Sequence, residues 1–181
     1  IELPVFGDLF RGPRGIVYLT PEERSLVHGV SGNATVPSVV VGSGINVPER
    51  HGEVDLRARF GIASPYVLYV GRIDRNKGAD RLFTHWQRLA EEWPDLPPLV
   101  LVGRPALAIP DHPKIRHLGF VSEEEKFALI AACDLLVLPS PYESLSVIVL
   151  EAWAMGRPVL VNSACKVLEG QCVRSGGGLF Y

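Results

Sequence analysis

The strongest constraint on the fold is an alternation of short apolar runs with helical segments through the second half of the chain. The runs 66–70, 99–102 and 135–138 are short and wholly apolar, as in strands that are buried on both faces of a parallel sheet. A helix is expected at 79–93, where six apolar residues share one stripe. The stripe consists of Leu82, Phe83, Trp86, Leu89, Ala90 and Trp93. Strands and helices that alternate across short loops predict an α/β fold, a Rossmann-like doubly wound parallel sheet.

Two helix starts are marked by capping residues. Thr20 followed by Pro21 fits an N-cap and a first helical position, and Ser122 with Glu125 fits a capping box. By contrast, three glycines and two prolines in residues 1–15 predict irregular connecting chain. Further strands are expected at 16–19, 36–41, 115–120 and 158–161, and a further helix at 147–155.

Composition and charge exclude several classes of protein. Lys plus Arg number 18 and Asp plus Glu number 20, giving a formal net charge of -2, which argues against a nucleic-acid binder and an acidic disordered chain. The three cysteines form no C-x-x-C pair, and Cys133, in an apolar run, is expected in the core of a protein from a reducing compartment. The five histidines show no metal-ligand spacing, so no metal is expected.

The sequence also bears on location. No run approaches the roughly 20 apolar residues that cross a bilayer, and the first residues lack the basic start and apolar block of a secretory signal. We therefore expect a cytoplasmic protein. The chain begins at Ile1 instead of a methionine, which suggests a processed or excised piece of a longer protein.

The loop after Val70 carries the first candidate binding residues. It runs from Gly71 to Gly78 and includes Arg72 and Lys77. Glycine lets the backbone approach a ligand closely, and the two cations would neutralise an oxyanion beside the start of a helix. The loop matches neither the Walker A pattern nor G-x-G-x-x-G. A solvated basic turn is the alternative interpretation.

The loop after Leu138 carries two acids, Glu143 just before the expected helix and Glu151 inside it. At 1.5 Å per residue they are offset by about 12 Å along the axis. Glu151 lies among apolar residues, so a structural ion pair, for example with an arginine, is the alternative to ligand binding. For Glu143 the alternative is an exposed loop acid or a charge at the helix N-terminus. Because both loops end at the same edge of a parallel sheet, the cations and carboxylates together suit a sugar diphosphate.

At these residues the chain resembles the C-terminal, donor-binding half of retaining glycosyltransferases with the GT-B fold, the glycosyl transferases group 1. The resemblance extends from about residue 16 to residue 181. The matching features are Gly71-Arg72, Lys77-Gly78, Pro139-Ser140, the Glu143 to Glu151 spacing, Gly156-Arg157-Pro158-Val159, the closing Gly178-Leu179-Phe180-Tyr181 and the upstream 39–46 segment.

The resemblance implies transfer of a hexose from a nucleoside diphosphate sugar, with UDP or GDP expected, and with retention of configuration. Arg72, Lys77 and Glu143 would be catalytic, and no cofactor would be needed. Glu151 would hold the ribose hydroxyls, and the base would lie against Gly119, Phe120 and Val121. The donor-binding set would be Gly71, Arg72, Lys77, Phe120, Val121, Glu143, Ser144, Leu145, Ser146 and Glu151.

The resemblance also implies a division of the chain. Residues 1–35 would be the tail end of an N-terminal acceptor domain with connecting chain, and 36–181 the donor domain without its final helices. The absent domain would bind the acceptor (a sugar, lipid or glycan) and would contact the inner membrane face peripherally, so the isolated piece is expected to be inactive. No nucleic-acid partner is expected.

Two departures from the family pattern bear on the site. Ser144-Leu145-Ser146 stands where the family often has Gly-Phe-Gly, and 164–170 departs from the usual Gly-Gly-x-Pro-Glu. A nucleotide-sugar 2-epimerase on the same fold and a non-catalytic nucleotide-sugar-binding domain remain the alternative functions.

Overall fold

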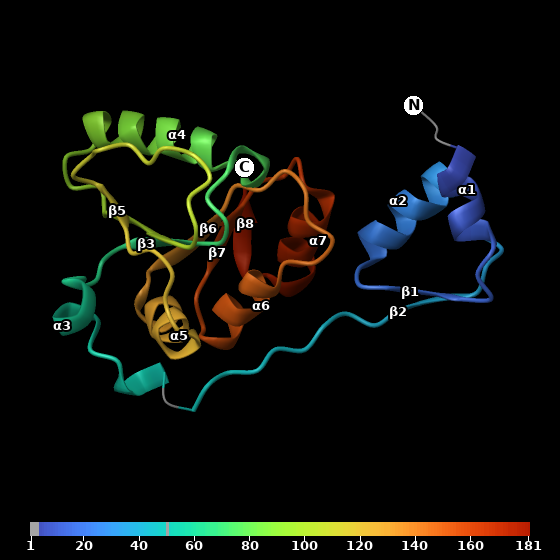
Figure 1. Cartoon of the computed structure of the whole chain (residues 1–181), viewed down its shortest axis with the longest axis horizontal. Helices are drawn as coiled ribbons and strands as arrows, with labels where there is room; N and C mark the ends of the chain where they lie inside the picture. The colour runs from blue at the N-terminus through green and yellow to red at the C-terminus, as the bar shows by residue number, and fades with distance from the viewer. Residues whose placement is uncertain (1–3, 50) are drawn as a thin grey trace.

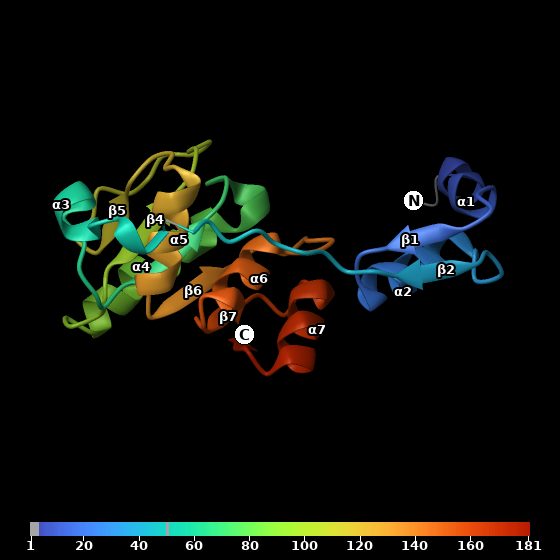
Figure 2. The ribbon, with the colours of Figure 1, turned by 90° about the horizontal axis from the view of Figure 1, so that it is seen from below.

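The structure, a computed structural model, describes residues 4–49 and 51–181. It has a small N-terminal unit and a larger unit built on a six-stranded sheet (Figure 1). The small unit contains α1 (Pro4–Arg11), β1 (Ile16–Tyr18), α2 (Pro21–Ser31) and β2 (Ser38–Val40). The strands β1 and β2 pair in parallel through the α2 crossover. An extended segment then leads from β2 to the larger unit (Figure 2).

The helix α1 corrects the expectation that residues 1–15 are irregular chain. Pro4 occupies its first position, where a missing N–H has no cost, and Gly12 follows its last residue. The helix packs on α2, and the Arg11 guanidinium donates to the carbonyl of Ser31 over 3.2 Å. Tertiary packing therefore outweighs the glycine content of the segment. Residues 1–3 lie outside the described part of the chain.

The larger unit confirms the expected doubly wound parallel sheet. The strand order is β5-β4-β3-β6-β7-β8, and every neighbouring pair is parallel. The expected strand at 115–120 is shorter and ends at His117. The elements are η1 (His51–Glu53), α3 (Leu56–Phe60), β3 (Val67–Val70), η2 (Arg75–Lys77), α4 (Ala79–Glu92), β4 (Leu99–Val102), β5 (Ile115–His117), α5 (Glu123–Ala132), β6 (Leu135–Leu138), α6 (Val147–Ala154), β7 (Val159–Val161), α7 (Lys166–Ser175) and β8 (Gly178–Phe180).

Helices cover the two faces of the sheet unequally. The cluster on one face includes residues of α5, α6 and α7, and Cys133 is fully buried there, as expected. On the other face α4 buries Leu82, Phe83 and Trp86 (Figure 1). Trp93 was expected on this stripe but is 59% exposed, because the helix ends before it and Trp93 takes an extended conformation.

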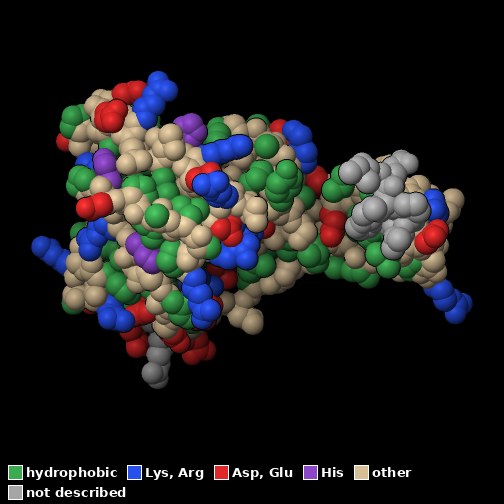
Figure 3. All heavy atoms as spheres, turned by 45° about the horizontal axis from the view of Figure 1, so that its top comes forward, with side chains coloured by type: hydrophobic (Ala, Val, Ile, Leu, Met, Phe, Trp, Pro, Cys, Tyr) green, Lys and Arg blue, Asp and Glu red, His purple; other side chains and the backbone are tan. Residues whose placement is uncertain are grey.

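Charged side chains are distributed without a dominant field. Figure 3 shows acidic and basic side chains mixed over the face it draws, in keeping with a net charge of -2. Within the described ranges, no helix has the length and apolarity that a bilayer crossing requires.

The division of the chain at residues 35 and 36 stays a prediction. In the structure β2 pairs with β1 and not with the six-stranded sheet, so residues 38–40 lie with the N-terminal unit. Polar side-chain contacts among the described residues join that unit to the rest. Glu22 of α2 forms a two-pronged ion pair with Arg174 of α7, and the Thr20 hydroxyl donates to the Ser144 carbonyl over 3.3 Å.

Glycine at one position lets the loops after β3 and β6 touch. Gly78 has φ +74°, and a Cβ added there would lie 2.5 Å from the carbonyl oxygen of Pro139. The backbone of Pro139 cannot move aside as the end of a flexible side chain could. The close approach of these two loops therefore depends on the absence of a side chain at this position.

We expect Gly78→Ala to destabilise the fold more than a glycine replacement that adds backbone strain alone. Gly176 is the matched control, since it has φ +65° with no atom within 4 Å of an added Cβ. Alanine at Gly176 should cost about 1–2 kcal/mol of unfolding free energy, and at Gly78 at least about 1 kcal/mol more. Urea denaturation measures both. Equal losses would show that the loops tolerate separation.

Alkaline pH should destabilise the fold through groups that burial keeps protonated. Burial raises the pKa of the Cys133 thiol to about 12 and also raises the pKa of the Tyr66 hydroxyl. A group whose pKa is higher in the folded than in the unfolded state stabilises the fold fully at pH values below its unfolded pKa, which is about 8.5 for cysteine. This stabilisation is lost as the pH rises toward the folded pKa. The urea midpoint should therefore fall between about pH 9 and 11.

Cys133→Ala should make this alkaline fall shallower whatever its effect on stability at neutral pH, because it removes one of the groups that titrate. A variant with the wild-type slope between these pH values would contradict the assignment to Cys133.

Candidate functional site

The sheet has one topological switch point, between β3 and β6. From β3 the order runs outward to β4 and β5, and from β6 it runs the other way to β7 and β8. Ligands of doubly wound sheets bind outside the carboxyl ends of the strands at this point. The two loops that the sequence singled out, 71–78 and 139–146, follow these two strands and contact each other at Gly78 and Pro139.

The loop after β3 is held by its own hydrogen bonds. Asp74 caps η2, since its carboxylate accepts from the Lys77 backbone N–H over 2.8 Å, and it also pairs with the Arg72 guanidinium. The buried Tyr69 hydroxyl donates to the Arg72 carbonyl over 2.7 Å. The loop is therefore an ordered structure that presents Arg72, whose side chain is 61% exposed. The sequence analysis did not single out Asp74, although an Asp directly before a helical turn is a typical N-cap residue.

Lys77 and Glu143 meet across the switch point. The Lys77 Nζ lies 2.8 Å from the Glu143 Oε1, and the two side chains are 32% and 14% exposed. A carboxylate this deeply buried is costly unless it is paired. Glu143 is therefore not the exposed loop acid of the alternative interpretation, and the structure brings two of the predicted site residues into direct contact.

The start of α6 faces the same loop. The Ser144 carbonyl accepts from the Thr20 hydroxyl over 3.3 Å, and the backbone N–H of the buried Ser146 points to the Gln171 Oε1 at 3.5 Å. Ser146 is the N-cap residue but forms no side-chain cap hydrogen bond, and Leu145 between the two serines is half-buried. The helix N-terminus therefore contributes partial positive charge near Glu143.

Glu151 forms a buried ion pair, as the structural alternative proposed, but its partner is a lysine. The Lys126 Nζ of α5 lies 2.8 Å from the Glu151 Oε1 and 2.8 Å from the Glu123 Oε2. The side chains of Lys126 and Glu151 are 15% and 10% exposed. Burial alone would lower the pKa of Lys126, but the hydrogen bonds to Glu123 and Glu151 outweigh it and hold that pKa above its usual value. Lys126 was missed because it lies on another helix.

The region expected to hold the base is divided between surface and core. Phe120 is 78% exposed, and the Arg104 guanidinium lies 5.7 Å from the centre of its ring. The Val121 side chain is buried in the core, so only its backbone remains available to a ligand. Gly119 has φ +76°, and its carbonyl accepts from the Gly103 N–H over 2.8 Å.

A cleft of about 1070 Å³ lies between α2 and the loop after β6. Glu143 and the exposed Tyr142 line one side, Glu22 and Leu26 of α2 the other, and Lys166 at the start of α7 also borders it. Among the predicted site residues, Glu143 and Ser144 reach this cleft directly. Within residues 4–49 and 51–181, no three His, Cys, Asp or Glu side chains are grouped to hold a metal ion.

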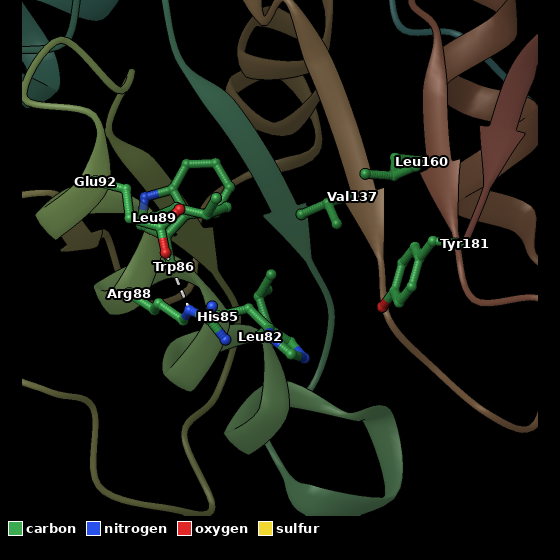
Figure 4. A pocket seen from close by; sticks show the side chains of 9 residues that line it. All are labelled: Leu82, His85, Trp86, Arg88, Leu89, Glu92, Val137, Leu160 and Tyr181. Atoms are coloured by element: carbon green, nitrogen blue, oxygen red, sulfur yellow. Dashed lines mark hydrogen bonds and ion pairs between the residues drawn. The ribbon is translucent and has the colours of Figure 1, made fainter.

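A second cavity, of about 410 Å³, lies on the face of the sheet that α4 covers (Figure 4). Its walls are mostly apolar, and no predicted site residue lines it. The lining side chains come from α4, β6, β7 and the residue after β8: Leu82, His85, Trp86, Arg88, Leu89, Glu92, Val137, Leu160 and Tyr181.

The chain is similar in sequence to several named sugar transferases. The alpha-D-kanosaminyltransferase of Streptomyces kanamyceticus is 35% identical over 129 residues, which cover 64% of this chain and 33% of that protein. The phosphatidyl-myo-inositol mannosyltransferase of Propionibacterium freudenreichii subsp. shermanii is 29% identical over 156 residues, 84% of this chain and 39% of that protein. The chain thus spans between about a third and two fifths of the length of these relatives.

Among solved structures, the sucrose-phosphate synthase of Thermosynechococcus elongatus superposes with a TM-score of 0.75 at 21% identity, over 97% of this chain and 47% of that one. This likeness shows the fold, which is that of a GT-B glycosyltransferase domain. Residues 64–177 match the model of the glycosyl transferases group 1. The resemblance seen in the sequence is therefore confirmed, and the chain belongs to the glycosyl transferases group 1.

Proposed function

We propose that this chain is the donor-binding part of a glycosyltransferase that takes a hexose from a nucleoside diphosphate sugar and transfers it with retention of configuration. The observation that carries the proposal is the Lys77–Glu143 contact across the switch point. It places a cation suited to a diphosphate and a carboxylate suited to sugar hydroxyls where ligands of doubly wound sheets bind. The names of the relatives support the reaction class.

The diphosphate would bind at the cationic side of the site. Lys77 and the exposed Arg72 would neutralise its oxygens, and the N-terminus of α6 around Ser144 to Ser146 would add backbone N–H groups. Charge accumulates on the diphosphate as the glycosidic bond breaks. Cations fixed there in advance stabilise that charge most strongly in the transition state.

The two acids would hold the two ends of the donor. Glu143 borders the cleft and would contact the transferred sugar once Lys77 turns to the phosphates. Glu151 lies about one turn inside α6 and would accept hydrogen bonds from the ribose hydroxyls. Phe120, at the carboxyl edge of β5, would offer its exposed ring to the base.

The acceptor would enter the cleft from the side of α2. In the whole protein we propose that an N-terminal domain binds it, and that it is a sugar, lipid or glycan. A cytoplasmic protein in peripheral contact with a membrane would suit a lipid acceptor.

Calorimetric titration with UDP-glucose, GDP-mannose and ADP-glucose tests donor binding. One of the three should bind, and Lys77→Ala or Glu151→Ala should weaken it by about tenfold to a hundredfold, the effect of losing a hydrogen bond to a charged group. Arg88→Ala is the control, because Arg88 pairs with Glu92 on the surface of α4, away from the predicted site residues. Affinities unchanged in both site variants would contradict the proposed site.

Glu143→Gln should separate phosphate binding from sugar transfer. In the free protein the Glu143 carboxylate pairs with the Lys77 ammonium group. Loss of this carboxylate charge should therefore tighten binding of the nucleoside diphosphate that the chain recognises (UDP, GDP or ADP) by about tenfold. Transfer by the full-length enzyme should fall, because the sugar loses its carboxylate contact. In the Lys77→Ala background the gain in affinity should disappear. A gain that persists there would show that Glu143 acts by general charge repulsion and not through Lys77.

A further inference from the structure

Lys126 occupies a position that is unfavourable for a cation on two counts. It lies in the first turn of α5, where the partial positive charge of the helix N-terminus disfavours an ammonium group. Its side chain is also only 15% exposed, and burying a charge is costly unless it is paired. Two carboxylates 2.8 Å from its Nζ offset both costs.

The two carboxylates depend on Lys126 to different degrees. Glu123 is 69% exposed, so water can solvate it if the lysine is removed. Glu151 is 10% exposed, and Lys126 is its one cationic partner within residues 4–49 and 51–181. Only Glu151 would therefore be left as an unsupported buried charge.

One oxygen of Glu151 remains available to a ligand. Lys126 binds Oε1, while Oε2 accepts no hydrogen bond from the described residues. Oε2 is also not one of the fully buried polar atoms without a hydrogen-bond partner, so this oxygen keeps some contact with solvent. The α5 first turn directly follows the loop after β5, so the pair lies toward the carboxyl edge of the sheet, where the switch point is.

We propose that Lys126 is a positioning residue for donor recognition: it pins one oxygen of Glu151 so that the other oxygen is presented to the vicinal hydroxyls of the ribose. This proposal rests on the proposed function, because it takes the ligand to be a nucleotide. Lys126 itself would not contact the reacting atoms.

Calorimetric titration of this chain with UDP, GDP and ADP, each beside its 2′,3′-dideoxy analogue, tests the proposal. The wild type should bind one ribonucleotide about tenfold to a hundredfold more tightly than its analogue. Lys126→Met should lose most of this discrimination while it keeps the affinity for the dideoxy analogue. Lys126→Arg, which retains the cation, should restore much of it. Glu151→Gln should lose it, and adding Lys126→Met to that variant should cause no further loss.

Arg59→Met is the matched control. Arg59 pairs with Glu125 in the same turn of α5, 2.8 Å from Nε to Oε1, without touching Glu151, so its loss should leave discrimination unchanged. If Lys126→Met does not fold, Lys126→Gln takes its place, with folding followed by circular dichroism and by affinity for the dideoxy analogue.

The outcomes separate this proposal from the proposed function. Discrimination that survives in folded Lys126→Met or Lys126→Gln would overturn the role of Lys126 and leave donor binding intact. A wild type that binds without discrimination would overturn the role of Glu151 and, with it, that of Lys126. Absence of binding by all three ribonucleotides would overturn the proposed function of the chain and this proposal with it.

Discussion

The parallel pairing of β3 with β6 sets the positions of Lys77 and Glu143, the two predicted site residues that meet at the switch point. Leu68 lies opposite Leu136 in this register, and both strands end at the same edge. The loops that follow are therefore brought together, and Lys77 meets Glu143 although 66 residues separate them in sequence. Gly78 completes the arrangement, because only a residue without a side chain allows the first loop to approach the carbonyl of Pro139 so closely. The apolar runs that form the sheet thus determine the chemistry at its edge.

Each of the two buried glutamates at this edge pairs with a lysine. Lys77 pairs with Glu143, and Lys126 pairs with Glu151 and also with the exposed Glu123. Asp74 pairs with Arg72 in turn. These ion pairs satisfy the folding requirement that buried charges be compensated. The two pairs differ in exposure, since the Lys77 side chain is 32% exposed and that of Lys126 15%. This difference suits the two proposed roles, in which the more exposed lysine exchanges its carboxylate for the anion of the ligand and the buried one fixes its carboxylate.

The sheet and the edge loops were predictable because buried strands leave a continuous apolar signal. What the sequence did not reveal depends on contacts between distant segments. The helix α1 forms in glycine-rich chain because it packs on α2. The partner of Glu151 could be expected in kind but not identified, since Lys126 is 25 residues away on a different helix. The run Glu123-Glu124-Glu125-Lys126 followed by apolar residues was a usable signal, as a cation just before a buried stretch needs an acid nearby.

Polar contacts also join the N-terminal unit to the loop after β6 that carries Glu143. The Thr20 hydroxyl caps α2 by accepting from the Glu23 N–H over 3.1 Å, and it donates to the carbonyl of Ser144. In the first turn of α2, Glu22 reaches Arg174 of α7 across Gly170, where an added Cβ would clash with the Glu22 Oε1. The wall of the cleft on the α2 side and the loop that carries Glu143 are therefore linked through one buried hydroxyl. A shift of α2 would either break that hydrogen bond or carry the Ser144 backbone with it. The width of the cleft therefore depends in part on the position of the loop that carries Glu143.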